Sequence, residues 1–223
     1  MPANKESLRL IGLAKSTCTT RILLVFAEKK IEFSFYQPDM ANGELKTPPL
    51  LNKNPFGTVP ILEDGEYVIF ESRAIARYLA IKYANIGTPL VPPWEDLKAW
   101  ALFEQWASVE LSHFDPPATT IYLQKYVFPL RGKKTDEFAV TAALEVLQMK
   151  LDILDDILSK QQYLAGQTFS LVDIFYAPTI SGLIRAGETE LITSRSHLND
   201  WWLRFTARPS WKMVLEAYHA HEQ

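Results

Sequence analysis

The most informative part of the sequence is Asn54–Leu79, which reads NPFGTVPILEDGEYVIFESRAIARYL. Asp64-Gly65 separates two short β-like runs, and an Asp-Gly pair in that position predicts a hairpin. Because proline is disfavoured inside a central strand, Val59-Pro60 predicts a bend with a cis peptide bond, where backbone groups are open to a ligand. Glu71-Ser72 then begins an amphipathic helix. We expect this stretch to bind a small anionic peptide.

The residues around this stretch predict an α/β domain over residues 1–85. Apolar residues recur at helical spacing after Ser16 and alternate with polar residues before the first loop. The resulting order is β-α-β and then β-β-α, which corresponds to a mixed four-stranded sheet with helices. The predicted elements are a strand at Leu8–Leu13, a helix from about Ser16, a strand at Glu32–Gln37, a loop at Asp39–Asn54, hairpin strands at Pro60–Leu62 and Tyr67–Phe70, and a helix at Ser72–Tyr83.

A Gly- and Pro-rich connection follows this domain, and we place the linker at residues 86–93. Beyond it there is almost no strand signal, so residues 94–223 are expected to form an all-helical domain. Pro116-Pro117 is expected to break or kink a helix, because prolines remove hydrogen-bond donors and clash with the preceding turn. The predicted helices are Trp94–Leu111, Thr119–Phe128, Thr135–Ser159, Leu171–Ile184, Asn199–Thr206 and Ser210–His219.

Composition narrows the class of protein. Lys and Arg total 23 and Asp and Glu total 26, so the net charge of 23 − 26 = −3 provides no basic field for nucleic acid or an anionic membrane. The single cysteine, Cys18, excludes an intramolecular disulfide and is typical of a reducing compartment. We find no secretory signal, no apolar run long enough to cross a bilayer and no convincing set of metal-binding histidines. We therefore expect a cytoplasmic protein without a metal.

Taken together, the motifs resemble those of the cytosolic glutathione transferases, and within them the phi class. The resemblance covers nearly the whole chain and is carried by KSTCTTRI, GELK, NPFGTVPILEDG, FESRAIARYL, YLAGQTFSLVDIFYAP and the late WW…RPSW. It implies a thioredoxin-like first domain that binds glutathione and a helical second domain that lines the pocket for the electrophile. It also implies a homodimer that conjugates reduced glutathione, its co-substrate, to small hydrophobic electrophiles in detoxification.

The resemblance assigns roles to individual residues. The family's activating serine falls on Ser16. The backbone of Val59 would pair with the cysteinyl part of glutathione, with Pro60 as the cis-proline of the family. Glu71 and Ser72 would hold the γ-glutamyl end.

Two positions depart from the pattern of the family. Lys46 matches a contact to the glycine carboxylate, but the preceding residue is Leu45 where plant phi members usually have histidine. Thr58 stands where the family has a glutamine that contacts glutathione. These departures remove one hydrogen-bond donor and shorten another.

The residues themselves support this chemistry at Ser16. The nucleophile in glutathione transfer is the thiolate, and a hydroxyl at a helix N-terminus can stabilise a nearby anion without a metal or a general base. The alternative is a serine that only caps the helix. Ser170 has that alternative role, because Ser170 and Asp173 form a capping-box pattern ahead of an apolar run.

Two other functions remain open. A peroxidase or thiol transferase would use Cys18, which lies in the first turn of the same helix, where a thiol pKa can fall. A non-catalytic carrier would bind hydrophobic ligands without chemistry.

The pocket for the electrophile has four candidate residues, which are Lys15, Phe114, Ile121 and Tyr122. The alternative to a role in the pocket is that these residues pack in the interior of the protein.

Overall fold

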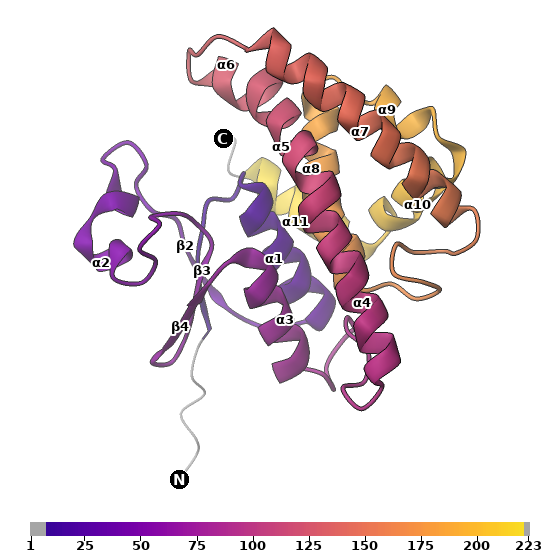
Figure 1. The fold of residues 1–223 in the computed structure, drawn as a ribbon. Coiled ribbons are helices and arrows are strands. Elements are labelled where there is room, and N and C mark those ends of the chain that lie inside the picture. Colours follow the sequence, from indigo (N-terminus) through magenta and orange to yellow (C-terminus); the bar gives the residue numbers. More distant parts are fainter. Residues whose placement is uncertain (1–7, 221–223) are drawn as a thin grey trace. The chain divides into compact units, whose positions relative to one another are not determined.

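The structure, a computed structural model, describes the backbone of residues 8–220 and the side chains of residues 8–216 (Figure 1). The chain divides into two compact units. The first comprises Met1–Pro89 together with Pro209–Gln223, and the second comprises Leu90–Arg208.

The first unit contains the predicted mixed sheet. Its four strands are in the order β2-β1-β3-β4. β1 runs parallel to β2 and antiparallel to β3, and β3 and β4 form the antiparallel hairpin. The elements are β1 (Arg9–Ile11), α1 (Thr17–Lys29), β2 (Ser34–Tyr36), η1 (Glu44–Lys46), α2 (Pro48–Leu51), β3 (Ile61–Asp64), β4 (Tyr67–Phe70), α3 (Ser72–Lys82) and α11 (Pro209–Ala220).

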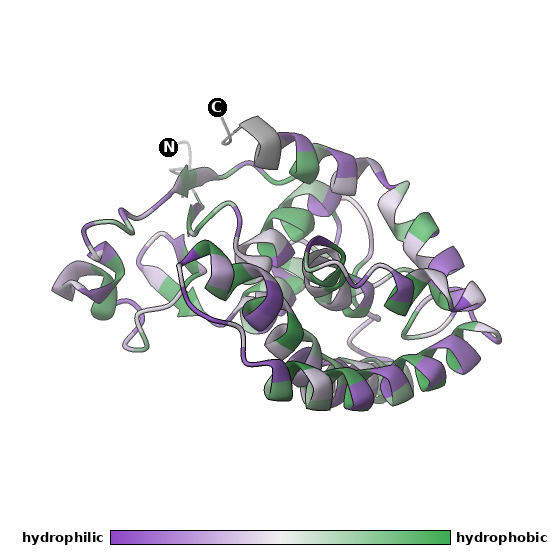
Figure 2. Ribbon diagram, turned by 90° about the horizontal axis from the view of Figure 1, so that it is seen from above, coloured by the Kyte–Doolittle hydropathy of each residue, from purple (hydrophilic) through white to green (hydrophobic). Residues whose placement is uncertain are grey.

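Apolar faces explain how this unit packs. α1 and α3 lie side by side in Figure 1 and are in contact. Ile22 and Val25 of α1, and Ile75 and Leu79 of α3, are completely buried. Figure 2 shows hydrophobic and hydrophilic residues alternating along most helices, as expected for helices that bury one face.

The last helix, α11, belongs to the first unit, whereas the sequence analysis assigned all of residues 94–223 to the second domain. The physical reason is its packing on α1. Trp211 and Val214 are buried, and the Ser210 hydroxyl donates to the Glu28 carboxylate at 2.5 Å. Thr88, at the end of the first unit's main segment, donates to the same carboxylate at 2.5 Å. A contact between residues so far apart in the sequence cannot be predicted from local sequence patterns, so the assignment of α11 required the structure.

The hairpin turn lies one residue later than predicted. Asp64 pairs with Tyr67, so the turn consists of Gly65-Glu66 and Asp64 belongs to β3. Its carboxylate accepts from the Tyr78 hydroxyl at 2.5 Å and from the Lys82 ammonium, both on α3. Burial alone would raise the pKa of Asp64, but these two hydrogen bonds hold it below its usual value. The contacts with α3 therefore keep this residue in the strand.

The segment predicted as a loop at Asp39–Asn54 contains two short helical pieces, η1 and α2. The Glu44 carboxylate accepts from the Tyr36 hydroxyl at 2.6 Å and from the Asp39 backbone N–H at 2.7 Å, which anchors η1 to the end of β2. The Tyr36 hydrogen bond lowers the pKa of Glu44. Pro48 begins α2, where its missing N–H costs nothing.

All the named elements of the second unit within the described residues are helical, as predicted. Its longest helices are α7 and α8, and α8 is buried on nearly every side. The elements are α4 (Leu97–Val109), η2 (Glu110–Phe114), α5 (Asp115–Tyr122), η3 (Leu123–Val127), α6 (Phe128–Leu130), α7 (Glu137–Leu158), α8 (Leu171–Arg185), α9 (Glu190–Thr193) and α10 (Ser196–Thr206).

A break or a kink was expected at Pro116-Pro117, and the break is wrong. The chain stays helical through both prolines, because the wider π-helical turn η2 immediately precedes them. Its closing bond joins the Asp115 N–H to the Glu110 carbonyl, five residues back. This restarts the hydrogen-bond pattern and places proline in the first turn of α5, where a missing N–H is tolerated.

The capping box at the start of α8 is confirmed. Ser170 accepts from the Val172 N–H at 3.2 Å, and the Asp173 carboxylate accepts from the Ser170 N–H at 2.9 Å. Asp173 also accepts from the Leu164 N–H and the Trp201 indole N–H. It is fully buried, and burial raises its pKa despite these hydrogen bonds.

Candidate active site

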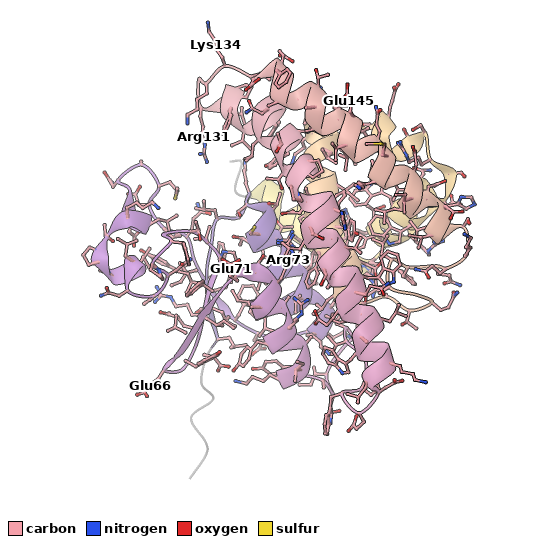
Figure 3. All side chains as sticks on the ribbon, in the orientation of Figure 1. Glu66, Glu71, Arg73, Arg131, Lys134 and Glu145 are labelled. Carbon is pink, nitrogen blue, oxygen red and sulfur yellow. The ribbon has the colours of Figure 1, made fainter. Side chains whose placement is uncertain are left out.

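Strand register brings the predicted site residues of the first unit to one end of the sheet. Ile11 of β1 pairs with Ile61 of β3, and Ile61 pairs with Phe70 of β4. The chain therefore leaves β1 towards Ser16, enters β3 from Val59, and leaves β4 towards Glu71 at that same end. Figure 3 shows Glu71 at the start of α3 and Glu66 at the opposite end of the hairpin.

Ser16 is the N-cap of α1, as predicted. Its extended backbone has φ −78° and ψ 130°, and its hydroxyl accepts from the Thr19 N–H at a long 3.4 Å. The residue is half-buried, and the first turn of α1 has no acidic residue. A partly exposed hydroxyl at the positive end of a helix is suited to donate to an anion.

Cys18 follows in the first turn of α1 and is also half-buried. Its sulfur lies 3.6 Å from the Arg21 guanidinium, one turn further along the helix. Arg21 is only 1% exposed and donates to the Ser72 hydroxyl at 2.8 Å. Sequence reasoning missed Arg21, because the two residues are 51 positions apart and no spacing rule connects them.

The Val59-Pro60 peptide bond is cis, as predicted. The turn that precedes it is held by Asn54, which is 1% exposed. Its side-chain amide donates to the Thr58 carbonyl at 2.9 Å and to the Thr58 hydroxyl at 3.0 Å, and its oxygen accepts from the Phe56 N–H at 3.1 Å. Asn54 begins the stretch on which the sequence analysis opened, but the sequence analysis assigned no role to its side chain, although an Asn before a Pro is a turn signal.

Lys46 is exposed at the end of η1 and donates to the Phe56 carbonyl at 3.1 Å. Gly57 permits this contact: its φ is +58°, and a side-chain carbon there would lie 2.7 Å from the Lys46 ammonium. Leu45 points the other way, into a buried cluster with Ile11 and Ile61. The apolar residue at position 45 thus contributes to the core of the first unit.

Glu71 and Ser72 differ sharply in exposure. Glu71 is exposed and has φ 71° and ψ 109°, a conformation that costs free energy for a residue with a side chain. Ser72 is the first residue of α3 and is 4% exposed. Strained backbone of this kind is concentrated at ligand sites, where it directs particular groups towards the ligand.

Two profiles of known protein domains match this chain. The profile of the glutathione S-transferase N-terminal domain matches residues 6–81, and that of the C-terminal domain matches residues 118–209. The chain belongs to the glutathione S-transferase family.

Its relatives cover nearly the whole chain. A glutathione S-transferase of Arabidopsis thaliana, PM239X14, is 41% identical over 198 residues, which span 88% of this chain and 90% of the relative. PARB of Nicotiana tabacum is 38% identical over 210 residues, which span 94% and 98%. The crystal structure of glutathione transferase F7 from Populus trichocarpa has a TM-score of 0.90 at 37% identity and covers 95% and 99% of the two chains. These relatives are plant transferases of the phi class, as the sequence motifs indicated.

The four candidate residues for the electrophile pocket of this transferase differ in how exposed their side chains are. Lys15 is exposed and directly precedes Ser16. Phe114, Ile121 and Tyr122 are 1%, 0% and 8% exposed. Phe114 packs on Tyr176 with ring centroids 4.5 Å apart. Their burial favours the interior-packing alternative for these three residues.

Neither a metal site nor a membrane span is found within the described part of the transferase. Residues 8–216, whose side chains are described, contain no group of three or more His, Cys, Asp or Glu side chains arranged for a metal. None of the helices within residues 8–220 is long and apolar enough to cross a membrane.

Proposed function

We propose that this transferase conjugates reduced glutathione to small hydrophobic electrophiles, and that the Ser16 hydroxyl stabilises the glutathione thiolate. The observation that carries the proposal is the half-buried Ser16 hydroxyl at the start of α1, at the same end of the sheet as Val59 and Glu71. A maize relative, glutathione S-transferase I, is described in complex with an atrazine glutathione conjugate at 30% identity and a TM-score of 0.86. That complex supports a hydrophobic electrophile as the second substrate.

The interactions available at Ser16 are strong enough to lower the thiol pKa of glutathione into the neutral range. A free thiol has a pKa near 8.5, and lowering it by about 2 units requires about 2.7 kcal/mol of preferential stabilisation of the thiolate. A hydrogen bond to an anion contributes roughly 1.5–3 kcal/mol, and a helix N-terminus adds roughly 0.3–1 kcal/mol. The absence of an acidic residue in the first turn of α1 avoids repulsion of the thiolate.

In this proposal, residues around Ser16 bind the glycine, cysteinyl and γ-glutamyl parts of glutathione. The exposed Lys46 ammonium attracts the glycine carboxylate, and Thr58 lies in the adjoining turn. The Val59 backbone pairs with the cysteinyl residue. Glu71 accepts from the γ-glutamyl ammonium, and the Ser72 hydroxyl donates to its carboxylate.

We further infer a cytoplasmic homodimer that acts in detoxification. The support is the resemblance to the phi class and the single cysteine. In this proposal the first unit binds glutathione and the helical unit selects the electrophile.

Cys18 supports a second candidate function, thiol–disulfide exchange on glutathione adducts. Its half-buried sulfur lies in the first turn of α1 and contacts the Arg21 guanidinium. Two variants separate the candidates. Ser16→Ala should abolish most conjugation of an aryl halide, and Cys18→Ser should leave conjugation intact.

The assays are conjugation to an aryl halide and glutathione-dependent reduction of a disulfide, combined with calorimetric titration of glutathione. Full conjugating activity in Ser16→Ala would contradict the role of Ser16. Disulfide reduction that is lost in Cys18→Ser but kept in Ser16→Ala would establish the second function. If the wild-type protein binds no glutathione, the carrier hypothesis replaces both.

A further inference from the structure

A buried arginine lies behind the predicted site for the γ-glutamyl end of glutathione. Arg21 is 1% exposed and comes from α1, whereas Ser72 is the first residue of α3. The Arg21 guanidinium donates to the Ser72 hydroxyl oxygen at 2.8 Å, within a buried contact. Burying a guanidinium is costly unless it is well hydrogen-bonded. The buried Arg21 guanidinium therefore depends on its hydrogen bonds, one of which is the bond to Ser72.

The contact controls the direction in which Ser72 can donate. A serine hydroxyl has one proton to donate and two lone pairs that accept, whereas a guanidinium only donates. When Arg21 occupies one lone pair, the hydroxyl proton must point away from the guanidinium. A charged donor also polarises the O–H bond and makes it a stronger donor to an anion.

Ser72 lies where a hydroxyl proton that points away from Arg21 could be donated to a bound anion. Ser72 stands at the N-terminus of α3, an eleven-residue helix (Ser72–Lys82) without an acidic residue in its first turn. The residue before it, Glu71, has the strained φ of 71°. A carboxylate bound at this helix start would receive the Ser72 proton and the favourable end of the helix dipole.

We propose that Arg21 is a positioning residue for glutathione, which orients the Ser72 hydroxyl so that it donates to the γ-glutamyl α-carboxylate. This rests on the proposed function. Arg21 itself does not touch the carboxylate. It acts through the Ser72 oxygen, which links α1 to the start of α3, and it also contacts the Cys18 sulfur in the first turn of its own helix.

The test compares two peptides and three proteins. The peptides are glutathione and 4-aminobutanoyl-cysteinylglycine, which lacks only the γ-glutamyl α-carboxylate. The proteins are the wild type, Arg21→Met and Arg77→Met. Arg77 is the control, since it lies on α3 and its guanidinium donates to the Arg73 carbonyl. Calorimetric titration gives the affinity of each protein for each peptide.

We expect the wild type and Arg77→Met to bind glutathione about tenfold or more tightly than the analogue, the loss expected for one charge-assisted hydrogen bond. Arg21→Met should reduce this ratio to within about twofold, chiefly by weakening glutathione binding. Its KM for glutathione should rise by a similar factor, while kcat at saturating glutathione stays nearly constant. Arg21→Met in the Ser72→Ala background should add no further loss of discrimination.

Other results would overturn the inference. Equal weakening for both peptides would mean that Arg21 only supports the fold, and an unchanged ratio would mean that it plays no part. If Arg21→Met does not fold, Arg21→Leu, which likewise removes every donor, is measured in the same way. A reduced ratio then supports the proposal and an unchanged one refutes it.

Failure of the proposed function is distinguishable from failure of this inference. A wild-type protein that binds neither peptide would refute the proposed function. A wild-type protein that binds both equally would refute only the roles of Ser72 and Arg21.

Discussion

Two serines begin helices in this protein in the same way locally, yet their surroundings differ. Ser16 and Ser170 both have extended backbone and accept a hydrogen bond from the first turn of their helix. Ser170 is 7% exposed and shares its turn with Asp173, whose carboxylate accepts from neighbouring N–H groups. Ser16 is half-buried, and no acidic residue lies in its first turn. We infer from this comparison that the Ser16 hydroxyl is open to an outside anion because its turn contains no carboxylate, whereas Ser170 and Asp173 complete their helix start with each other.

The largest expected effect concerns the carboxylate that completes the Ser170 helix start. Asp173→Ala removes the acceptor of the Leu164, Ser170 and Trp201 N–H groups. Each orphaned buried donor costs roughly 1–3 kcal/mol, so the free energy of unfolding should fall by at least about 3 kcal/mol. Urea unfolding measures it.

The control for this experiment is Asp156→Ala. Asp156 belongs to an exposed ion pair with Lys160, with both side chains 68% exposed. Such pairs contribute little, so its variant should unfold close to the wild-type midpoint. A loss below 1 kcal/mol in Asp173→Ala would show that the Ser170 helix start does not depend on its internal anion.

The next effect concerns Ser16. Ser16→Ala should raise the pKa of bound glutathione and lower kcat/KM about 10- to 100-fold, corresponding to the roughly 1.5–3 kcal/mol of a hydrogen bond to an anion. Its stability should change by about 1 kcal/mol or less, because its capping bond is long at 3.4 Å. The pH dependence of thiolate absorbance in the complex measures the pKa. An unaltered profile would place Ser16 in the same class as Ser170.

Ser170→Ala is the converse variant. It should lower the free energy of unfolding by roughly 0.5–2 kcal/mol, as expected for loss of an N-cap. The activity per folded molecule should stay unchanged, since this serine is turned into a completed capping box. Thermal unfolding and a conjugation assay on the same sample check both parts. Unaltered thermal unfolding, or a specific loss of activity, would break the comparison.

The smallest effect is expected when an acidic side chain is introduced into the first turn of α1, next to Ser16. Thr17→Glu places a carboxylate in the first turn of α1, where it should stabilise the helix by roughly 0.3–1 kcal/mol. The same charge should repel the thiolate and raise its pKa. Thr17→Gln is the matched neutral control. If Thr17→Glu binds glutathione and ionises it as the control does, the absence of an internal anion is not what opens this helix start.

Several features of the fold and site follow from short-range signals. The cis bond at Val59-Pro60, the caps at Ser16 and Ser170 and the hairpin were all predicted, because each depends on a few adjacent residues. Other features depend on packing. The turn shifted by one residue because Asp64 contacts α3, and the helix continued through Pro116-Pro117 because a π-helical turn adjusted its register.

The sequence by itself determined the fold class, the positions of the helix starts and the family, because apolar periodicity, capping patterns and motif order are read locally. Only the tertiary structure decided which distant residues contact the helix starts and the core of the first unit. It joined Arg21 to Ser72 across 51 positions, buried Leu45 in the core, and attached α11 to the first unit through Glu28. Such contacts arise when distant elements pack together, and nothing in the spacing of residues along the chain encodes them individually.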